Sequence, residues 1–288
     1  MSGVLYIVAT PIGNLGDIGA RALAVLHEVD LIAVEDTRHS RRLLEHHGIK
    51  TPMQAYHAFN ESERTASLLA RVAGGGKVAL ISDAGTPLIS DPGYQLVRQA
   101  HQRGLRVTPL PGPCAAVAAL CAAGQPADRF CFEGFLPARR AARLAVLEDL
   151  AQEARTLVFY EAPHRIEESL ADMVAVFGAA RELTLARELT KTYETLLHGT
   201  LGDLLRRVRS DPDQRKGELV LVVAGAPRVV ERSLDAATRH TLAMLLEELP
   251  LKQAAALAAR ITGHKKNLLY DEALRLREAG GGRQEEKD

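Results

Sequence analysis

The chain has 288 residues, with 36 basic and 36 acidic side chains, and is 25% charged and 47% hydrophobic. This composition is that of globular proteins and excludes a collagen-like, coiled-coil or mainly disordered chain, while the balanced charge excludes a globally basic nucleic-acid-binding surface. At about 150 residues per domain, the length predicts roughly two domains with a small third.

The first part of the chain alternates short β-branched runs with helical patterns, as parallel-sheet α/β domains do. Asp17 is the expected N-cap of the first helix, Asn60 with Glu63 resembles a capping box, and Asp91 with Pro92 resembles an N-cap followed by the first helical position. The expected strands are residues 4–10, 31–35, 53–58, 77–82 and 106–110, and the expected helices are 18–28, 40–47, 60–73 and 92–104.

The Pro111-Gly112-Pro113 segment is a stiff break, and we place a domain boundary there. The second domain, expected to be more antiparallel, has predicted strands at 130–135, 156–160, 182–187, 194–198 and 218–224, and helices at 114–122, 140–153 and 163–177. We therefore predict an N-terminal α/β domain over 1–112 and a C-terminal α/β domain over 113–228.

A linker is expected after the second domain, at residues 227–234. Residues 235–279 then predict three helices, with breaks at Pro250 and at Thr262-Gly263, and 280–288 predict a disordered tail. The last two helices have helix-turn-helix proportions, although a plain αα-hairpin fits the pattern equally well.

The three cysteines, Cys114, Cys121 and Cys131, are odd in number and lack Cys-x-x-Cys spacing, which argues against a disulfide framework and a zinc knuckle. No His-Glu-x-x-His motif is present, so no metal site is expected. The longest apolar run, residues 114–123, falls short of the ~18 residues of a membrane span. We expect a cytoplasmic protein without a membrane partner.

Three unusual loops follow strands of the first domain, at residues 10–17, 35–38 and 82–93. In an open parallel sheet the carboxyl ends of the strands share one edge, so these loops should converge on one crevice. Gly13, Gly16 and Gly19 match neither the Gly-x-Gly-x-x-Gly pattern nor a Walker A sequence. The crevice therefore favours a ligand with a cationic or uncharged reactive centre over a polyphosphate.

Several of these segments together resemble the tetrapyrrole methylase superfamily, which comprises class III S-adenosylmethionine-dependent methyltransferases. Within it, the similarity is greatest to the enzymes that methylate small-subunit ribosomal RNA. The motifs run in order from about residue 4 to about residue 275 and lie at residues 5–15, 35–38, 82–93, 109–115, 133–137, 160–165, 187–191 and 265–267.

The resemblance implies S-adenosylmethionine-dependent methylation of the ribose 2′-hydroxyl of a cytidine in the decoding region of small-subunit (16S) ribosomal RNA. It also implies a homodimer of chains with two α/β domains, with the donor in the cleft between them. Carried onto this sequence, the donor contacts are Pro11, Gly85, Thr86, Pro87, Ile89, Cys114, Ala115, Glu161, Leu189 and Ala224. Porphyrin-modifying relatives have Gly-Asp-Pro where this chain has Gly85-Thr86-Pro87, which disfavours a tetrapyrrole substrate.

Methyl transfer to a ribose hydroxyl is helped by a carboxylate or imidazole that removes the hydroxyl proton. The candidates are Glu35, Asp36, Asp83 and Asp91, and we prefer Glu35, followed by Asp83, as the catalytic base. A helix-capping role is the alternative for Asp91, and a salt bridge near Arg38 is the alternative for Glu35 and Asp36.

RNA must be held by local positive charge, because phosphate contacts give most of the affinity. Three clusters are candidates, and an ordinary solvated helix face is the alternative for each: Arg38, Arg41 and Arg42; Arg139, Arg140 and Arg143; Lys265 and Lys266. Aromatic residues are only 4% of the chain and Trp is absent, which disfavours an extended base-stacking platform.

Two other functions are compatible with parts of the pattern. One is S-adenosylmethionine-dependent methylation of a small molecule, which the basic clusters and the C-terminal helices disfavour. The other is a non-enzymatic regulator whose helix-turn-helix binds nucleic acid, which the large share of the chain in α/β domains disfavours. The partner that the resemblance implies is small-subunit ribosomal RNA or the ribosomal subunit.

Overall fold

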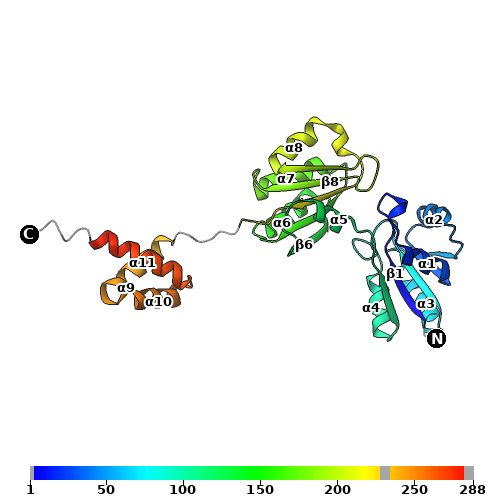
Figure 1. Cartoon of the computed structure of the whole chain (residues 1–288), viewed down its shortest axis with the longest axis horizontal. Helices are drawn as coiled ribbons and strands as arrows, with labels where there is room; N and C mark the ends of the chain where they lie inside the picture. Colours follow the sequence, from blue (N-terminus) through cyan, green and yellow to red (C-terminus); the bar gives the residue numbers. More distant parts are fainter. Residues whose placement is uncertain (1–2, 228–233, 282–288) are drawn as a thin grey trace, which may run out of the picture. The chain divides into compact units, whose positions relative to one another are not determined.

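The computed structural model describes residues 3–227 and 234–281, which form two compact units, 1–226 and 227–288 (Figure 1). The first unit holds both predicted α/β regions, each built on its own five-stranded sheet. We call residues 3–110 the first lobe and residues 114–226 the second lobe. The second unit is helical and is described separately.

The first lobe is a parallel sheet with the strand order β3-β2-β4-β1-β5. Its strands are β1 (Val4–Val8), β2 (Leu31–Val34), β3 (Met53–Ala55), β4 (Lys77–Ile81) and β5 (Arg106–Leu110). Its helices are α1 (Ala20–Glu28), α2 (Thr37–His46), α3 (Glu61–Ala73) and α4 (Tyr94–Gln102), with a 3-10 turn, η1, at Leu15–Asp17.

Both faces of this sheet are covered by helices, which explains why its strands are almost continuously apolar. Leu26 of α1 and Leu44 of α2 pack on one face, and Leu69 of α3 and Leu96 of α4 pack on the other. The sheet therefore has only its strand ends free for a site.

The second lobe has the strand order β6-β7-β10-β8-β9. Its strands are β6 (Phe130–Phe135), β7 (Thr156–Glu161), β8 (Glu182–Arg187), β9 (Thr195–Thr200) and β10 (Leu219–Val223). Only β6 and β7 pair in parallel, and the other pairs are antiparallel, which confirms the expected character of this region. Its helices are α5 (Ala115–Ala122), α6 (Arg140–Asp149), α7 (Ile166–Phe177) and α8 (Leu201–Ser210), with a 3-10 turn, η2, at Pro212–Arg215.

Alternating side chains of the second sheet serve two cores. Leu157 and Phe159 of β7 pack in the core that α6, α7 and α8 cover, whereas Val158 packs under α5. The period of two follows from the pleat of the strand.

Two predicted helix starts are wrong, and a third is right but lacks its predicted side-chain cap. Gly19 is at the N-cap of α1 and Asp17 belongs to η1, which Asn14 caps. Asn60 is at the N-cap position of α3, as predicted, but its side chain makes no capping hydrogen bond, because its amide oxygen accepts from the His57 backbone N at 2.9 Å. Asp91 lies two residues before the N-cap of α4, which is Gly93 with a φ of 129°.

The helical unit contains α9 (Ala236–Glu248), α10 (Leu251–Thr262) and α11 (Lys266–Gly281) around a small apolar core. The breaks fall at Pro250 and at Gly263, whose φ of 77° is the left-handed C-cap conformation that glycine favours. Three helices with these two breaks are confirmed. Helix α11 takes in Gly280 and Gly281 of the predicted tail, and the rest of that tail lies outside the described residues.

Candidate functional site

The loops after β1 and β4 meet at the carboxyl edge of the first sheet. The backbone N of Thr10 donates to the Gly85 carbonyl at 2.8 Å, and the Gly85 N donates back to the Thr10 carbonyl at 3.1 Å. The Thr86 hydroxyl donates to the Pro113 carbonyl at 2.9 Å, which ties the loop to the segment joining the lobes. The predicted convergence of these loops is therefore present.

The loop after β4 is conformationally strained. Leu88 and Ser90 have φ values of 73° and 67°, in the left-handed region that residues other than glycine rarely adopt. Such strain costs on the order of 1–3 kcal/mol per residue and is typical of functional loops. The loop is thus held in a shape that the local sequence alone does not favour.

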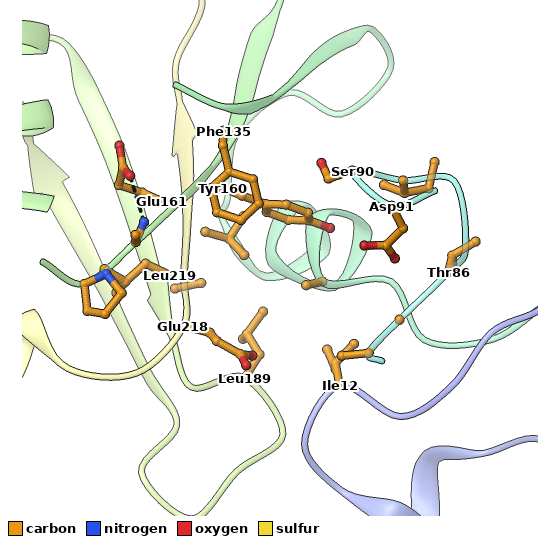
Figure 2. A pocket seen from close by; sticks show the side chains of 18 residues that line it. Ile12, Thr86, Ser90, Asp91, Phe135, Tyr160, Glu161, Leu189, Glu218 and Leu219 are labelled. Carbon is orange, nitrogen blue, oxygen red and sulfur yellow. Dashed lines mark hydrogen bonds between the residues drawn. The ribbon is translucent and has the colours of Figure 1, made fainter. Parts of the chain in front are cut away.

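A cavity of about 340 Å³, which we call the first cavity, lies where this loop faces the second lobe (Figure 2). Phe135 and Tyr160 form an aromatic wall on the side of the second lobe, opposite Ser90 and Asp91 of the first. The remaining lining residues are mostly apolar: Ile12, Ala84, Gly85, Thr86, Ile89, Ala115, Glu161, Ala162, Pro163, Ala186, Leu189, Glu218, Leu219 and Val220. A mainly apolar cavity of this size with a few polar groups is typical of a small-molecule site.

The aromatic wall is fixed by its own packing. The Tyr160 ring makes edge contacts with Phe132 and Phe135, and its hydroxyl accepts from the Ala116 backbone N at 3.2 Å. Burial raises the pKa of the Tyr160 hydroxyl, so it stays protonated at neutral pH. The wall is therefore a rigid, uncharged surface on which a flat ring can lie.

Carboxylates gather at the ends of β2 and β4. The Asp36 backbone N donates to Asp83 Oδ1 at 3.1 Å. Burial, followed by the nearby charge of Asp83, raises the pKa of Glu35. Burial, with the charge of Glu35 beside it, raises the pKa of Asp91 to about 6. Glu35, Asp83 and Asp91 are thus neighbouring carboxylates, and we call them the acid cluster.

A second cavity, of about 490 Å³, adjoins the first, and Ile12, Ala84 and Glu218 line both. Asp83 lines only the second cavity. Its other lining residues include several cations and the loop after β1: Pro11, Gly13, Leu15, Arg38, His39, Ser40, Arg42, Leu43, Ser82 and Lys191. The second cavity can therefore take a negatively charged ligand with a carboxylate beside it.

The ten predicted donor contacts do not all line the same cavity. Six of them line the first cavity: Gly85, Thr86, Ile89, Ala115, Glu161 and Leu189. Pro11 lines the second cavity, and Pro87 and Cys114 are outside the residues that line either.

Ala224 is a wrong prediction. It follows the end of β10, and its backbone N donates to the Glu182 carbonyl, at the start of β8. Because β10 runs antiparallel to β7 and β8, its beginning, at Leu219, lies at the cavity. Ala224 therefore lies at the opposite edge of the sheet.

Glu161 lines the first cavity, but its carboxylate is engaged elsewhere. Oε2 accepts from the Ser169 hydroxyl at 2.5 Å, and Oε1 accepts from the Ala162 N at 2.7 Å and pairs with Arg165 at 2.9 Å. Glu161 thus shapes the turn after β7, which brings Ala162 and Pro163 to the cavity.

The predicted RNA-binding cations are exposed except for Arg143. Its side chain is 1% exposed and pairs with Asp172 at 2.8 Å and with Glu168 at 3.4 Å. The prediction for Arg143 is therefore wrong, because a buried, paired guanidinium does not reach a phosphate. Arg140 is exposed and also pairs with Asp172, at 3.0 Å. The other predicted cations lie on exposed surfaces: Arg38, Arg41, Arg42, Arg139, Lys265 and Lys266.

Two features of the site are not predicted by the sequence. Phe135 with Tyr160 occur in the motifs without a predicted role, and so does Lys191. Asp91 is a candidate base with helix capping as the alternative, and the structure places it in the first cavity. The sequence signal for this position is Asp-Pro-Gly, which places a flexible glycine where the helix would begin.

Within the described ranges, no three His, Cys, Asp or Glu side chains are placed to hold a metal ion. Of the helices described, none is long and apolar enough to cross a membrane.

Comparison with known proteins gives the chain its family. Residues 4–205 match the family model of Tetrapyrrole (Corrin/Porphyrin) Methylases, and residues 232–277 match that of the RsmI C-terminal HTH domain. Two curated proteins named ribosomal RNA small subunit methyltransferase I are similar over nearly their whole length. The Pseudomonas aeruginosa protein is 59% identical over 95% of this chain and 97% of its own, and the Escherichia coli O157:H7 protein is 57% identical over 94% and 95%.

Solved structures show the same fold. The methyltransferase CobJ is 22% identical, with a TM-score of 0.59 over 79% of this chain and 97% of its own. Diphthine synthase is 13% identical, with a TM-score of 0.57 over 77% and 90%. With two α/β lobes that meet at a cavity, and with matches that cover most of its length, the chain belongs to the tetrapyrrole methylase family and carries that family's RsmI-type C-terminal helix-turn-helix domain.

Proposed function

We propose that this chain is an S-adenosylmethionine-dependent methyltransferase that methylates the ribose 2′-hydroxyl of a cytidine in the decoding region of small-subunit 16S ribosomal RNA. The relatives' name, ribosomal RNA small subunit methyltransferase I, supports the substrate. The observation that carries the proposal is the pair of adjoining cavities, one mainly apolar and one rich in cations, with Ile12, Ala84 and Glu218 in both linings. A transfer between two ligands needs such a junction.

The first cavity fits S-adenosylmethionine. The aromatic and aliphatic side of the cavity, with Tyr160, Leu189 and Leu219, suits a purine ring, and Asp91 supplies a carboxylate for a cationic group. When bound, this donor supplies a methyl carbon attached to a positively charged sulfur. Gly85 and Thr86 line the first cavity, and the φ of Gly85, 83°, lies in the left-handed region that favours glycine.

The second cavity fits the acceptor nucleotide. Arg38 and Arg42 provide positive charge for a phosphate, and Asp83 provides a carboxylate near a ribose hydroxyl. We assign the role of proton acceptor to Asp83, because Asp83 lines the second cavity whereas Glu35 lines neither cavity. This reverses the preference drawn from sequence.

The main contribution of the two lobes to catalysis is to align the reacting atoms. Holding the ribose oxygen, the methyl carbon and the sulfur in line can contribute roughly 7–11 kcal/mol to the lowering of the barrier. The Thr86–Pro113 hydrogen bond and the strained loop after β4 keep the floor of the site rigid for this purpose.

Exposed cations bind the RNA outside the nucleotide that is methylated. Arg41 lies beside the second cavity, Arg139 and Arg140 lie at the start of α6, and Lys265 and Lys266 lie at the start of α11. Phosphate contacts of this kind give affinity that falls with salt, and they carry no sequence information. We further propose that the enzyme acts in the cytoplasm as a homodimer, which sedimentation of the purified protein would test.

The decisive experiment offers isotopically labelled donor to purified protein with 16S RNA, with small subunits and with a pool of small metabolites. Label in a ribose 2′-O-methyl cytidine supports the proposal. Label in a small metabolite but not in RNA indicates the small-molecule methyltransferase, and nucleic-acid binding without any transfer indicates the regulator. Either of these outcomes would refute the proposal.

A further inference from the structure

The loop between β8 and β9 carries a lysine that reaches the first lobe. An added Cβ at Gly13 would lie 2.4 Å from Lys191 Cγ, so the lysine stem runs directly over that glycine. The Asn14 backbone N donates to the Thr190 hydroxyl at 3.1 Å, which fixes the loop to the same place. A residue of the second lobe thus lines the second cavity next to the turn after β1.

The backbone of this loop is strained. Glu188 and Thr190 have φ values of 51° and 66°, although neither is glycine. Side chains hold them there: Glu188 Oε1 accepts from the Glu218 backbone N at 2.9 Å, and the Thr190 N donates to Glu194 Oε2 at 2.7 Å. These contacts hold the loop, and Lys191 with it, in one fixed position.

Lys191 also lies at the wall between the cavities. Its Nζ pairs with Glu188 Oε1 at 2.8 Å and with Glu218 Oε2 at 3.2 Å, and Glu218 lines both cavities. The side chain is 26% exposed, whereas that of Arg38, in the same cavity, is 89% exposed. Lys191 is therefore less exposed to solvent than Arg38. It lies at the junction where the methyl group would pass from one cavity to the other.

The environment of Lys191 favours the charged form of its side chain. Burial pulls its pKa down, but the hydrogen bond to Glu188 and the charge of Glu218 outweigh this, so the pKa of Lys191 lies above its ordinary value. An ammonium that keeps its proton does not act as a base. It can donate hydrogen bonds to an oxygen that becomes negative.

We propose that Lys191 is a further catalytic residue whose ammonium contacts the acceptor oxygen in the second cavity and stabilises the negative charge that appears on this oxygen as its proton leaves, before the charge is lost to the new bond to carbon. This inference rests on the function proposed above. The ribose oxygen forms a bond to the methyl carbon while the bond from that carbon to sulfur breaks, and the sulfur keeps the electron pair and becomes neutral. The hydroxyl proton goes to the Asp83 carboxylate.

The test compares Lys191→Met with Lys216→Met in the full-length protein. Lys216 is an exposed lysine paired with Asp213 in η2, so it controls for the loss of one ion-paired charge. Removing one hydrogen-bond donor to a developing oxyanion lowers kcat on the order of 100- to 1,000-fold, and we expect this for Lys191→Met under single-turnover conditions. Donor affinity by calorimetry and RNA affinity should each stay within about threefold of wild type, and Lys216→Met should match wild type throughout.

Each competing reading gives a different result. A phosphate-binding lysine would weaken RNA affinity and reduce its salt dependence by about one ion while kcat stays unchanged. A purely structural lysine would lower thermal stability and donor affinity together. Either result, or an unchanged kcat, would overturn the inference. If wild-type protein methylates no RNA, the proposed function itself fails, which the same assay shows separately.

A second variant tests the placement from the other lobe. Gly13→Ala puts a methyl group against Lys191 Cγ and should displace the lysine without removing its charge. We expect kcat to fall at least tenfold in this variant, and Lys191→Arg to retain more activity than Lys191→Met. Wild-type kcat in Gly13→Ala, with Lys191 shown by a crystal structure to be displaced from the second cavity, would also contradict the inference.

Discussion

Replacing Asp91 with asparagine should make the protein more stable and a poorer binder of its donor. Asp91 lies half-buried in the first cavity, and burial together with the charge of Glu35 raises its pKa from an ordinary 3.8 to about 6. The folded protein therefore holds this proton more tightly than the unfolded chain. Between about pH 4 and pH 6 wild-type stability falls as the pH rises, and the full cost is present above that range.

The difference between 3.8 and about 6 corresponds to at most about 3 kcal/mol, at 1.36 kcal/mol per pH unit. Because Asp91 is only half-buried, solvent screening reduces this to about 1–2 kcal/mol. Asp91→Asn should raise the unfolding free energy by that amount at pH 8, and the gain should shrink towards zero between pH 7 and pH 4.

Urea unfolding at several pH values measures this difference, with Asp128→Asn as a control at an exposed aspartate. Calorimetry at pH 8 should show about tenfold weaker donor binding in Asp91→Asn, and wild-type affinity should fall below about pH 6 as Asp91 gains its proton. A variant that is no more stable than wild type at pH 8, or a gain that is the same at every pH, would refute the reasoning.

Three other substitutions test separate parts of the structure. Gly85→Ala should lower the unfolding free energy by about 1–2 kcal/mol and weaken donor binding. The reason is that the φ of Gly85 is 83° and the new Cβ would lie 3.3 Å from Ile12 Cγ2. An unchanged chemical denaturation curve would contradict this. Arg143→Ala should lower the unfolding free energy by about 3–5 kcal/mol, because it leaves Asp172 buried without this partner. The control Arg139→Ala, at an exposed residue, should stay within about 0.5 kcal/mol of wild type. Equal denaturation midpoints for the two variants would disprove the structural role of Arg143. Arg42→Ala should weaken RNA binding and reduce its salt slope by about one while donor affinity is kept, and an unchanged slope in a salt titration would remove Arg42 from the interface.

Local patterns in the sequence predicted most of the elements. The strands 130–135 and 182–187 are found with the expected bounds, because β-branched and aromatic residues within turn signals define them locally. The predicted start of α4 failed, because Asp91 and Pro92 satisfy the local rule for a cap whereas the chain uses Gly93 and turns Asp91 to the cavity.

The parts of the site that could not be predicted depend on long-range contacts. The burial of Arg143 depends on Asp172, which lies on another helix 29 residues away. Lys191 reaches the second cavity through a loop that contacts Asn14, 176 residues earlier in the chain. The direction of β10, which excludes Ala224, depends on strand pairing that periodicity does not show. Residue type and spacing alone carry none of this information.

The common lining of the two cavities has a kinetic consequence. Because Ile12, Ala84 and Glu218 line both, the two cavities adjoin each other, and both ligands must be present together for a group to cross. The reaction must then pass through a ternary complex, so initial-rate plots for the two substrates should intersect instead of running parallel. After transfer, the spent donor and the methylated RNA both contact these three shared side chains. Crowding at these residues should therefore affect the release of products more than the methyl transfer itself.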